Sequence, residues 1–223
     1  MKAEYRIMGC RDRLPMIAHL RSVLGISSEK CYIDMEMNGN PLETQLSALT
    51  IPCDKDSSHV VLVQDDCLVG SGFKENVDAL IGMNPDCIYS LFIPDTKGYG
   101  KTQRMIVRTG GAVCGLANII PAKYIEPYVR WWNGLKTYIS YKADDATLAV
   151  FAKMSNIEVY TTVPSIVEHR CNDGEHSSAL NHAHGMFTSV TTDLEADVTT
   201  FAYRKDLSLG EYNGSYLQKY IRK

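Results

Sequence analysis

The sequence lacks the features that mark membrane-spanning, disulfide-rich and strongly basic proteins. No stretch approaches the roughly 18 consecutive apolar residues that a membrane span needs, and Met1 to Arg6 contain no apolar signal region. The seven cysteines are scattered without a Cys-x-x-Cys pair, which favours reduced thiols over disulfides or a thiolate zinc site. The net charge of −3 provides no overall positive field for nucleic acid. We therefore expect a cytoplasmic protein without a membrane anchor.

The chain has the composition of an ordinary globular domain. Of its 223 residues, 45% are hydrophobic and 22% charged, which is enough apolar material for one sizeable core. There is no internal repeat, low-complexity tract or clear linker. Residues 1–223 are therefore predicted to form a single domain.

The first third of the chain alternates strand-like and helix-like segments. The predicted strands are short apolar runs at 5–8, 31–35, 59–63 and 87–92. The predicted helices have apolar residues at helical spacing over 14–24, 41–49 and 73–81. This order predicts an α/β fold of Rossmann-like type, with a mostly parallel sheet flanked by helices. In such sheets ligands bind at the carboxyl ends of the strands.

The later part of the chain has a weaker pattern. Strands are predicted at 103–108 and 158–162, and a helix at 143–154. A helix around Ile125 to Trp132 is expected to be kinked, or confined to short turns, by Pro127.

Two adjacent aspartates, Asp65 and Asp66, follow the most strand-like run of the chain. His59 to Val63 is apolar without alternation, which is typical of a central strand buried on both faces. Adjacent residues leaving a strand point in opposite directions. One carboxylate could therefore bind a divalent ion such as Mg²⁺ or Mn²⁺ while the other accepts hydrogen bonds from a ribose. The alternative is that the pair only caps a turn or the next helix.

A second acid pair, Asp144 and Asp145, opens a predicted helix. Acidic residues are favoured there by the helix dipole, so N-capping is the simpler interpretation. The functional interpretation is a general base that removes a proton from an attacking hydroxyl.

Four of the six histidines fall between positions 169 and 184: His169, His176, His182 and His184. His169 follows a strand and Pro164, where an imidazole could complete a metal shell or contact a phosphate. A polar surface loop and a zinc site remain alternatives for the cluster.

The aromatic pair Trp131 and Trp132 has two interpretations. Trp132 could form the floor of a sugar pocket, because aromatic faces pack on sugar rings. Paired tryptophans are more often core residues.

In this order the segments resemble the GT-A glycosyltransferases, particularly short cytosolic and bacteriophage-encoded members. The resemblance covers roughly residues 3 to 182 and includes Gly115 to Pro121 and Ser177-Ser178 beside the segments above. It implies a nucleotide-binding half over 1–93, an acceptor and catalytic half over 94–190, and a C-terminal extension over 191–223.

The resemblance also implies roles for the residues that follow the central strand. Asp66 looks like the metal ligand of an Asp-x-Asp-type motif and Asp65 like its ribose or sugar contact. Cys67 stands where a third acid would complete a longer motif, so Asp66 has to act as the terminal acid. His169 resembles the late histidine that ligates the metal or touches the diphosphate.

By the same resemblance, Asp145 looks like the catalytic base and Asp144 like a contact to an acceptor or sugar hydroxyl. Asp34, at the end of the second strand, resembles the residue that reads the nucleotide base. Arg11 or Arg13 would lie near the base or the phosphates.

The implied activity is inverting transfer of a sugar from a nucleotide-sugar, preferably a UDP-sugar, to an acceptor hydroxyl. The expected acceptor is a hydroxymethylated base in phage DNA, which would place the protein in the host cytoplasm. The stretch 204–223, with a net charge of +3, could bind the phosphates of this DNA. Alternatives are a cell-surface glycan or protein acceptor, a zinc-dependent hydrolase built on 169–184, and a non-catalytic nucleotide-binding protein.

Overall fold

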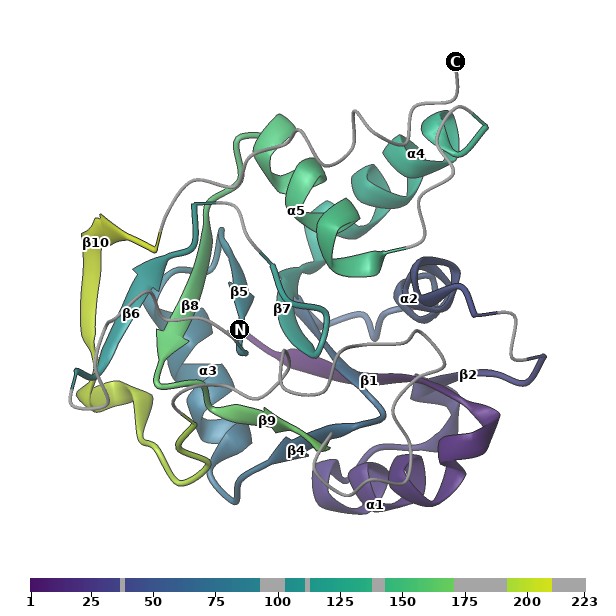
Figure 1. The fold of residues 1–223 in the computed structure, drawn as a ribbon, viewed down its shortest axis with the longest axis horizontal. Helices are drawn as coiled ribbons and strands as arrows, with labels where there is room; N and C mark the ends of the chain where they lie inside the picture. The colour runs from purple at the N-terminus through teal and green to yellow at the C-terminus, as the bar shows by residue number, and fades with distance from the viewer. Residues whose placement is uncertain (37–38, 93–102, 111–112, 138–142, 171–191, 210–223) are drawn as a thin grey trace.

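The centre of the molecule is an eight-stranded mixed sheet with strand order β10-β6-β8-β5-β7-β3-β1-β2 (Figure 1). The computed structural model describes residues 1–36, 39–92, 103–110, 113–137, 143–170 and 192–209. The strands of this sheet are β1 (Ala3–Cys10), β2 (Cys31–Asp34), β3 (His59–Gln64), β5 (Ile88–Ser90), β6 (Met105–Arg108), β7 (Ala117–Pro121), β8 (Val159–Val163) and β10 (Ala202–Ser208). A separate two-stranded sheet pairs β4 (Cys67–Val69) with β9 (Val167–His169).

Helices cover the sheet on both faces. The α-helices are α1 (Leu14–Leu24), α2 (Pro41–Leu49), α3 (Phe73–Met83), α4 (Ile125–Leu135) and α5 (Asp144–Met154). Short 3₁₀ segments are η1 (Arg11–Arg13), η2 (Ser28–Lys30), η3 (Ala122–Tyr124) and η5 (Val198–Thr200). The predicted α/β class and flanking helices are therefore confirmed.

The sheet is mixed, not uniformly parallel. Strands β1, β2, β3, β5 and β8 run one way, whereas β6, β7 and β10 run the other. The strand β7, which the sequence did not predict, lies antiparallel between β3 and β5. Antiparallel strands need no helical crossover, so the helix–strand alternation of the first third could not indicate it.

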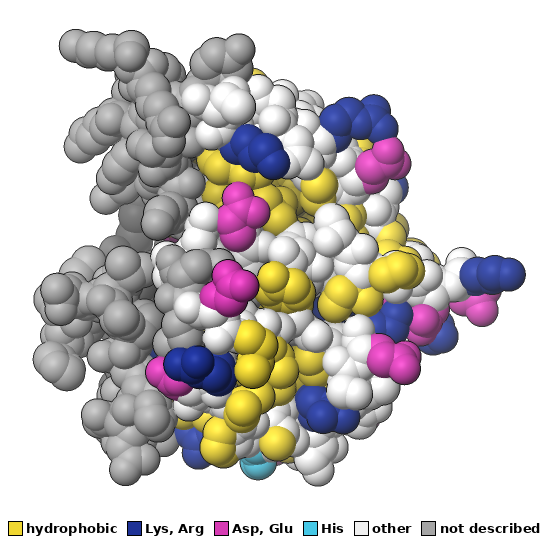
Figure 2. All heavy atoms as spheres, turned by 90° about the vertical axis from the view of Figure 1, so that its right-hand side faces the viewer, with side chains coloured by type: hydrophobic (Ala, Val, Ile, Leu, Met, Phe, Trp, Pro, Cys, Tyr) yellow, Lys and Arg dark blue, Asp and Glu magenta, His cyan; other side chains and the backbone are white. Residues whose placement is uncertain are grey.

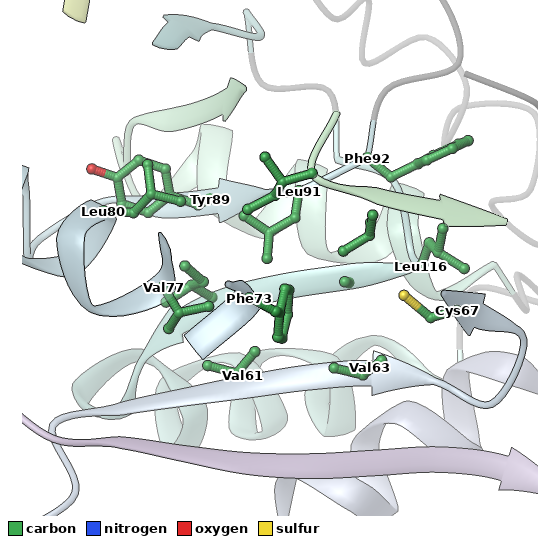
Figure 3. Close-up of a cluster of buried hydrophobic side chains, with 14 of the residues drawn as sticks. Val61, Val63, Cys67, Phe73, Val77, Leu80, Tyr89, Leu91, Phe92 and Leu116 are labelled. Atoms are coloured by element: carbon green, nitrogen blue, oxygen red, sulfur yellow. The ribbon is translucent and has the colours of Figure 1, made fainter. Parts of the chain in front are cut away.

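Strand β3 is buried on both faces, as predicted, and divides its side chains between two cores. Val61 and Val63 belong to the core that includes α1 and α3, whereas Val60 and Leu62 belong to the core that includes α2, α4 and α5. Figure 3 shows the first of these cores, where Val61 faces residues of α3. All four side chains are fully buried, so β3 packs against both cores.

The three parts that the sequence predicted contribute to one sheet. The boundary at residue 93 falls between β5 and β6, and β7 places a segment of the second part next to β3 of the first. The third part adds β10 beside β6. It is tied to α3 by Asn76, which donates to the Ala196 carbonyl at 2.6 Å and accepts from the Val198 amide at 2.9 Å.

Helix α4 is regular, contrary to the kink or short turns expected from Pro127. The helix runs from Ile125 to Leu135, so Pro127 occupies its third position. The first four amides of a helix have no partner within the helix. A proline there removes no hydrogen bond, and its fixed φ angle suits the first turn.

The side of the molecule that carries α1 and β2 has hydrophobic side chains interspersed with acidic and basic ones (Figure 2). Exposed large apolar residues of these two elements are Leu14, Val23 and Tyr32. Scattered apolar side chains among charges are normal for a protein surface. Among the helices of the described residues, none is long and apolar enough to cross a bilayer.

The contact between Gly70 and Leu194 provides a test of the fold. A Cβ atom at Gly70 would lie 1.7 Å from the Leu194 carbonyl oxygen. We expect Gly70→Ala to lower the free energy of unfolding by about 1–3 kcal/mol, because the backbone must move to make room. Urea denaturation measures this change.

The matched control is Gly82→Ala in α3. A Cβ atom there meets nothing within 4 Å, and alanine favours the helix by about 0.5–1 kcal/mol. Gly82→Ala should therefore be neutral or stabilising. Equal effects of the two substitutions would contradict the packing of residue 70 against residue 194.

Candidate functional site

The first acid pair lies buried where β3 ends. Asp65 and Asp66 form the turn between β3 and β4 and are 4% and 6% exposed. The same Arg13 Nη1 lies 2.7 Å from Asp65 Oδ1 and 2.6 Å from Asp66 Oδ2. The expectation that the two side chains point in opposite directions is therefore wrong for this structure. The chain turns at these residues, so both carboxylates converge on one cation.

The end of strand β1 contacts the side chain of Asp65. It runs parallel to β3, and the Cys10 amide at its end donates to Asp65 Oδ2 at 2.9 Å. A Cβ atom on Gly9 would lie 2.5 Å from the same oxygen, so glycine is needed for this close approach. Burial raises the pKa of Asp65, and the neighbouring Arg13 opposes that shift.

The two-stranded sheet brings His169 to Asp66. Strands β4 and β9 pair with Cys67 opposite His169, and the Arg170 amide donates to the Asp66 carbonyl at 2.9 Å. His169 Nε2 consequently lies 3.3 Å from Asp66 Oδ2. The other carboxylate oxygen, Asp66 Oδ1, is buried and has no hydrogen-bond partner among the described residues. The predicted pair of metal ligands therefore meets in space, with one acceptor atom of Asp66 unused.

The second acid pair is connected to the first through Gln64. Gln64 Nε2 donates to Asp144 Oδ2 at 2.9 Å, and Gln64 directly precedes the first acid pair. A Cβ atom on Gly115 would lie 2.8 Å from both of these atoms. Glycine at this position therefore leaves room for the hydrogen bond that joins the two acid pairs.

The start of α5 tests whether Asp144 and Asp145 only cap this helix. The N-cap residue is Ala143, which makes no side-chain cap. Asp145 Oδ1 accepts from the Ala146 amide at 2.6 Å, as a residue in the first helical turn can. Asp144 instead accepts from Gln64. The pair therefore does more than cap the helix.

Burial changes the protonation of the second acid pair. It raises the pKa of Asp144 to about 7, with a further contribution from Asp145, and it also raises the pKa of Asp145. Burial raises the pKa of the Cys114 thiol to about 12, and the negative charges of both acid pairs contribute. The contributing carboxylates are Asp145, Asp144 and Asp66. A buried carboxyl group with a raised pKa is suited to proton transfer near neutral pH.

The other predicted binding residues differ in their placement. Asp34 ends β2, pairs in register with Cys10 and is 8% exposed, so it lies at the same edge of the sheet as Asp65. Arg11 is exposed and forms an ion pair with Asp12 at 3.5 Å. Of the two predicted arginines, Arg13 is the one that contacts the acid pair.

Trp132 lies in the core, contrary to its predicted place in a sugar pocket. It is 3% exposed and belongs to the core formed with α2 and α5. A ring this deeply buried presents no open face to a sugar. It lies one helical turn after Tyr128, which donates to Gln45 Oε1 at 2.9 Å.

Most of the histidine-rich segment lies outside the described residues. This applies to His176, His182 and His184, and also to Ser177 and Ser178. In the part of the chain that the structure describes, there is no group of three or more His, Cys, Asp or Glu that could hold a metal ion.

The basic C-terminal stretch is likewise described only in part. Lys219, Arg222 and Lys223 fall outside the described residues. Within the described part, Arg204 forms an ion pair with Asp206 at 2.6 Å.

The sequence interpretation assigned no role to three residues that shape the site: Gln64, Gly9 and Gly115. Gln64 had a recognisable signal, because it is the polar residue that ends an apolar strand just before the acid pair. The two glycines had none. Their importance depends on close approaches to Asp65 and Asp144 that only the folded chain creates.

Neither a scan against protein-family models nor a search of the curated proteins finds a match to this chain. The function proposed below therefore rests on the geometry of the site and on the resemblance described above.

The raised pKa of Asp144 predicts a pH-dependent effect on stability. A carboxyl group with a raised pKa in the folded state holds its proton more tightly there than in the unfolded chain. Its contribution to stability therefore falls as the pH rises from about 4 to about 7. Asp144→Asn removes this loss, so the stability of the variant relative to the wild type should increase over that range, by at most about 1.4 kcal/mol per pH unit.

Denaturation in urea at pH 5 and pH 7.5 measures the difference. The control is Asp206→Asn, because the Arg204 hydrogen bond lowers the pKa of Asp206 to about 2. Its effect should be the same at both pH values. A pH-independent effect of Asp144→Asn would contradict the raised pKa.

Proposed function

We propose that this chain is a metal-dependent glycosyltransferase of the GT-A type. It transfers a sugar from a nucleotide-sugar, preferably a UDP-sugar, to an acceptor hydroxyl with inversion. The observation that carries the proposal is the meeting of Asp66 and His169, 3.3 Å apart although distant in sequence. It occurs at the carboxyl end of β3, a strand buried on both faces, and ligands of α/β proteins bind at such strand ends.

The residues present fit a divalent cation. Asp66 and His169 would hold Mn²⁺ or Mg²⁺, and the buried Asp66 Oδ1 is an acceptor with no partner in the part of the chain that the structure describes. Such ions often bind through one or two protein side chains, with substrate phosphates and water as the other ligands. When bound, the cation would neutralise charge that develops on the departing diphosphate.

The chain's own residues supply the remaining functions. Asp145 takes the proton of the attacking acceptor hydroxyl, and its burial raises its pKa, which makes it a better base. Asp144, held by Gln64, contacts an acceptor or sugar hydroxyl. Asp34 lies beside the end of β1, where it can bind the nucleotide base, and Asp65 contacts the ribose or sugar.

The acceptor that we propose is a hydroxymethylated base in phage DNA. The support is the resemblance to short phage-encoded members and the basic character of 204–223. A cell-surface glycan or a protein hydroxyl is the alternative acceptor for the same site.

Ligand-induced stabilisation tests the donor site. UDP with Mn²⁺ at about 100 times its dissociation constant should stabilise the protein by about 2.7 kcal/mol. Asp66→Asn should abolish the effect of Mn²⁺, because it removes the anionic ligand. Thermal denaturation with a panel of nucleoside diphosphates, with and without Mn²⁺, measures this. Asp86→Asn, which changes an exposed carboxylate, serves as the control and should respond like the wild type. No stabilisation by any nucleoside diphosphate would refute the proposal.

Asp145→Asn tests the catalytic base. The rate of UDP release from UDP-sugars in the presence of hydroxymethylated DNA should fall by at least about 100-fold, because a positioned general base contributes that much or more. The stabilisation by UDP and Mn²⁺ should persist, since this residue does not contact the donor diphosphate. A variant that keeps most of the wild-type rate would assign the proton transfer to another group.

A further inference from the structure

The guanidinium of Arg13 lies between the carboxylates of the first acid pair. A single nitrogen, Nη1, is 2.7 Å from Asp65 Oδ1 and 2.6 Å from Asp66 Oδ2. The side chains of the three residues are only 5–8% exposed. Arg13 ends η1, immediately before α1, so its backbone is anchored on regular structure.

The charge balance makes Arg13 the counter-ion of this pair. Burial alone would lower the pKa of Arg13, but Asp66 and Asp65 outweigh it and raise the pKa, so the guanidinium stays charged. Two buried carboxylates this close together without a cation would be strongly destabilising. The protein without ligand therefore already contains one cation at its acid pair.

We propose that Arg13 competes with the divalent cation for Asp66, and that a nucleoside diphosphate relieves this competition. The inference rests on the proposed function. Asp66 Oδ2 accepts from Arg13 and also faces His169 Nε2 at 3.3 Å. A cation held by Asp66 and His169 must share the carboxylate with the guanidinium, and the two like charges repel each other.

The diphosphate changes this balance because it offers Arg13 another anionic partner. Guanidinium groups bind phosphate oxygens with two parallel hydrogen bonds. Once Arg13 binds phosphate, Asp66 is available to the cation. Cation and nucleotide should therefore bind with positive coupling, and each should raise the affinity of the other by the same factor.

The experiment is a titration with Mn²⁺, in which electron paramagnetic resonance measures the concentration of free Mn²⁺. It compares the wild type, Arg13→Met and Arg11→Met, each without and with UDP. Arg11→Met removes the same charge from a neighbouring exposed side chain and so controls for general electrostatics.

Without UDP, Arg13→Met should bind Mn²⁺ at least roughly tenfold more tightly than the wild type, because a nearby positive charge is gone. Arg11→Met should change the affinity by less than about twofold, because exposed charges are screened by solvent and salt. UDP should tighten Mn²⁺ binding to the wild type by at least about tenfold and have much less effect on Arg13→Met. Equal or weaker Mn²⁺ binding by Arg13→Met without UDP would overturn the competition.

Thermal denaturation in Mn²⁺ gives a second readout, because Arg13→Met loses a buried counter-ion and is expected to be less stable. Mn²⁺ should raise the melting temperature of Arg13→Met more than that of the wild type, and adding Asp66→Asn should remove the difference. No Mn²⁺ stabilisation of Arg13→Met would likewise overturn the inference. A failure of the proposed function is recognised separately, because then the wild type responds to no nucleoside diphosphate at all.

Discussion

The register between β4 and β9 is the constraint on which the candidate site depends. Side chains alternate between the two faces of a strand, so a slip by one residue would turn His169 away from the face it now shares with its neighbours. The pairing of Cys67 with His169 fixes this register. The hydrogen bond from the Arg170 amide to the Asp66 carbonyl extends the ladder by one step. The pairing of two backbone segments thus brings an imidazole beside a carboxylate.

The elements of the fold that depend on local pattern were predictable. The run Val60–Val63 indicated a strand buried on both faces, and apolar spacing placed α1, α2, α3 and α5 within a few residues of their observed bounds. The strands β4, β7, β9 and β10 were missed. They are three to seven residues long, and they pair with strands that are distant in sequence.

The residue types of the site were predictable, but its geometry only partly. Acid and histidine side chains after strands drew attention to Asp66 and His169, and the start of a predicted helix drew attention to Asp144. The convergence of Asp65 and Asp66 on one arginine was not visible, because the prediction assumed the side-chain alternation of a strand where the chain makes a turn. Trp132 was assigned to a site although it lies in the core. Aromatic residues serve both cores and sugar sites, and the burial that separates the two is not visible in the sequence.

The central position of β7 has a consequence for the order in which the chain becomes a sheet. During synthesis β1, β2 and β3 emerge first and can pair, but β3 and β5 acquire their common neighbour only after residue 121 has left the ribosome. Until then the apolar edge of β3 is open, and open edges of this kind invite pairing with other chains. The nascent protein is therefore expected to depend most on chaperones in the interval between the completion of β3 and that of β7.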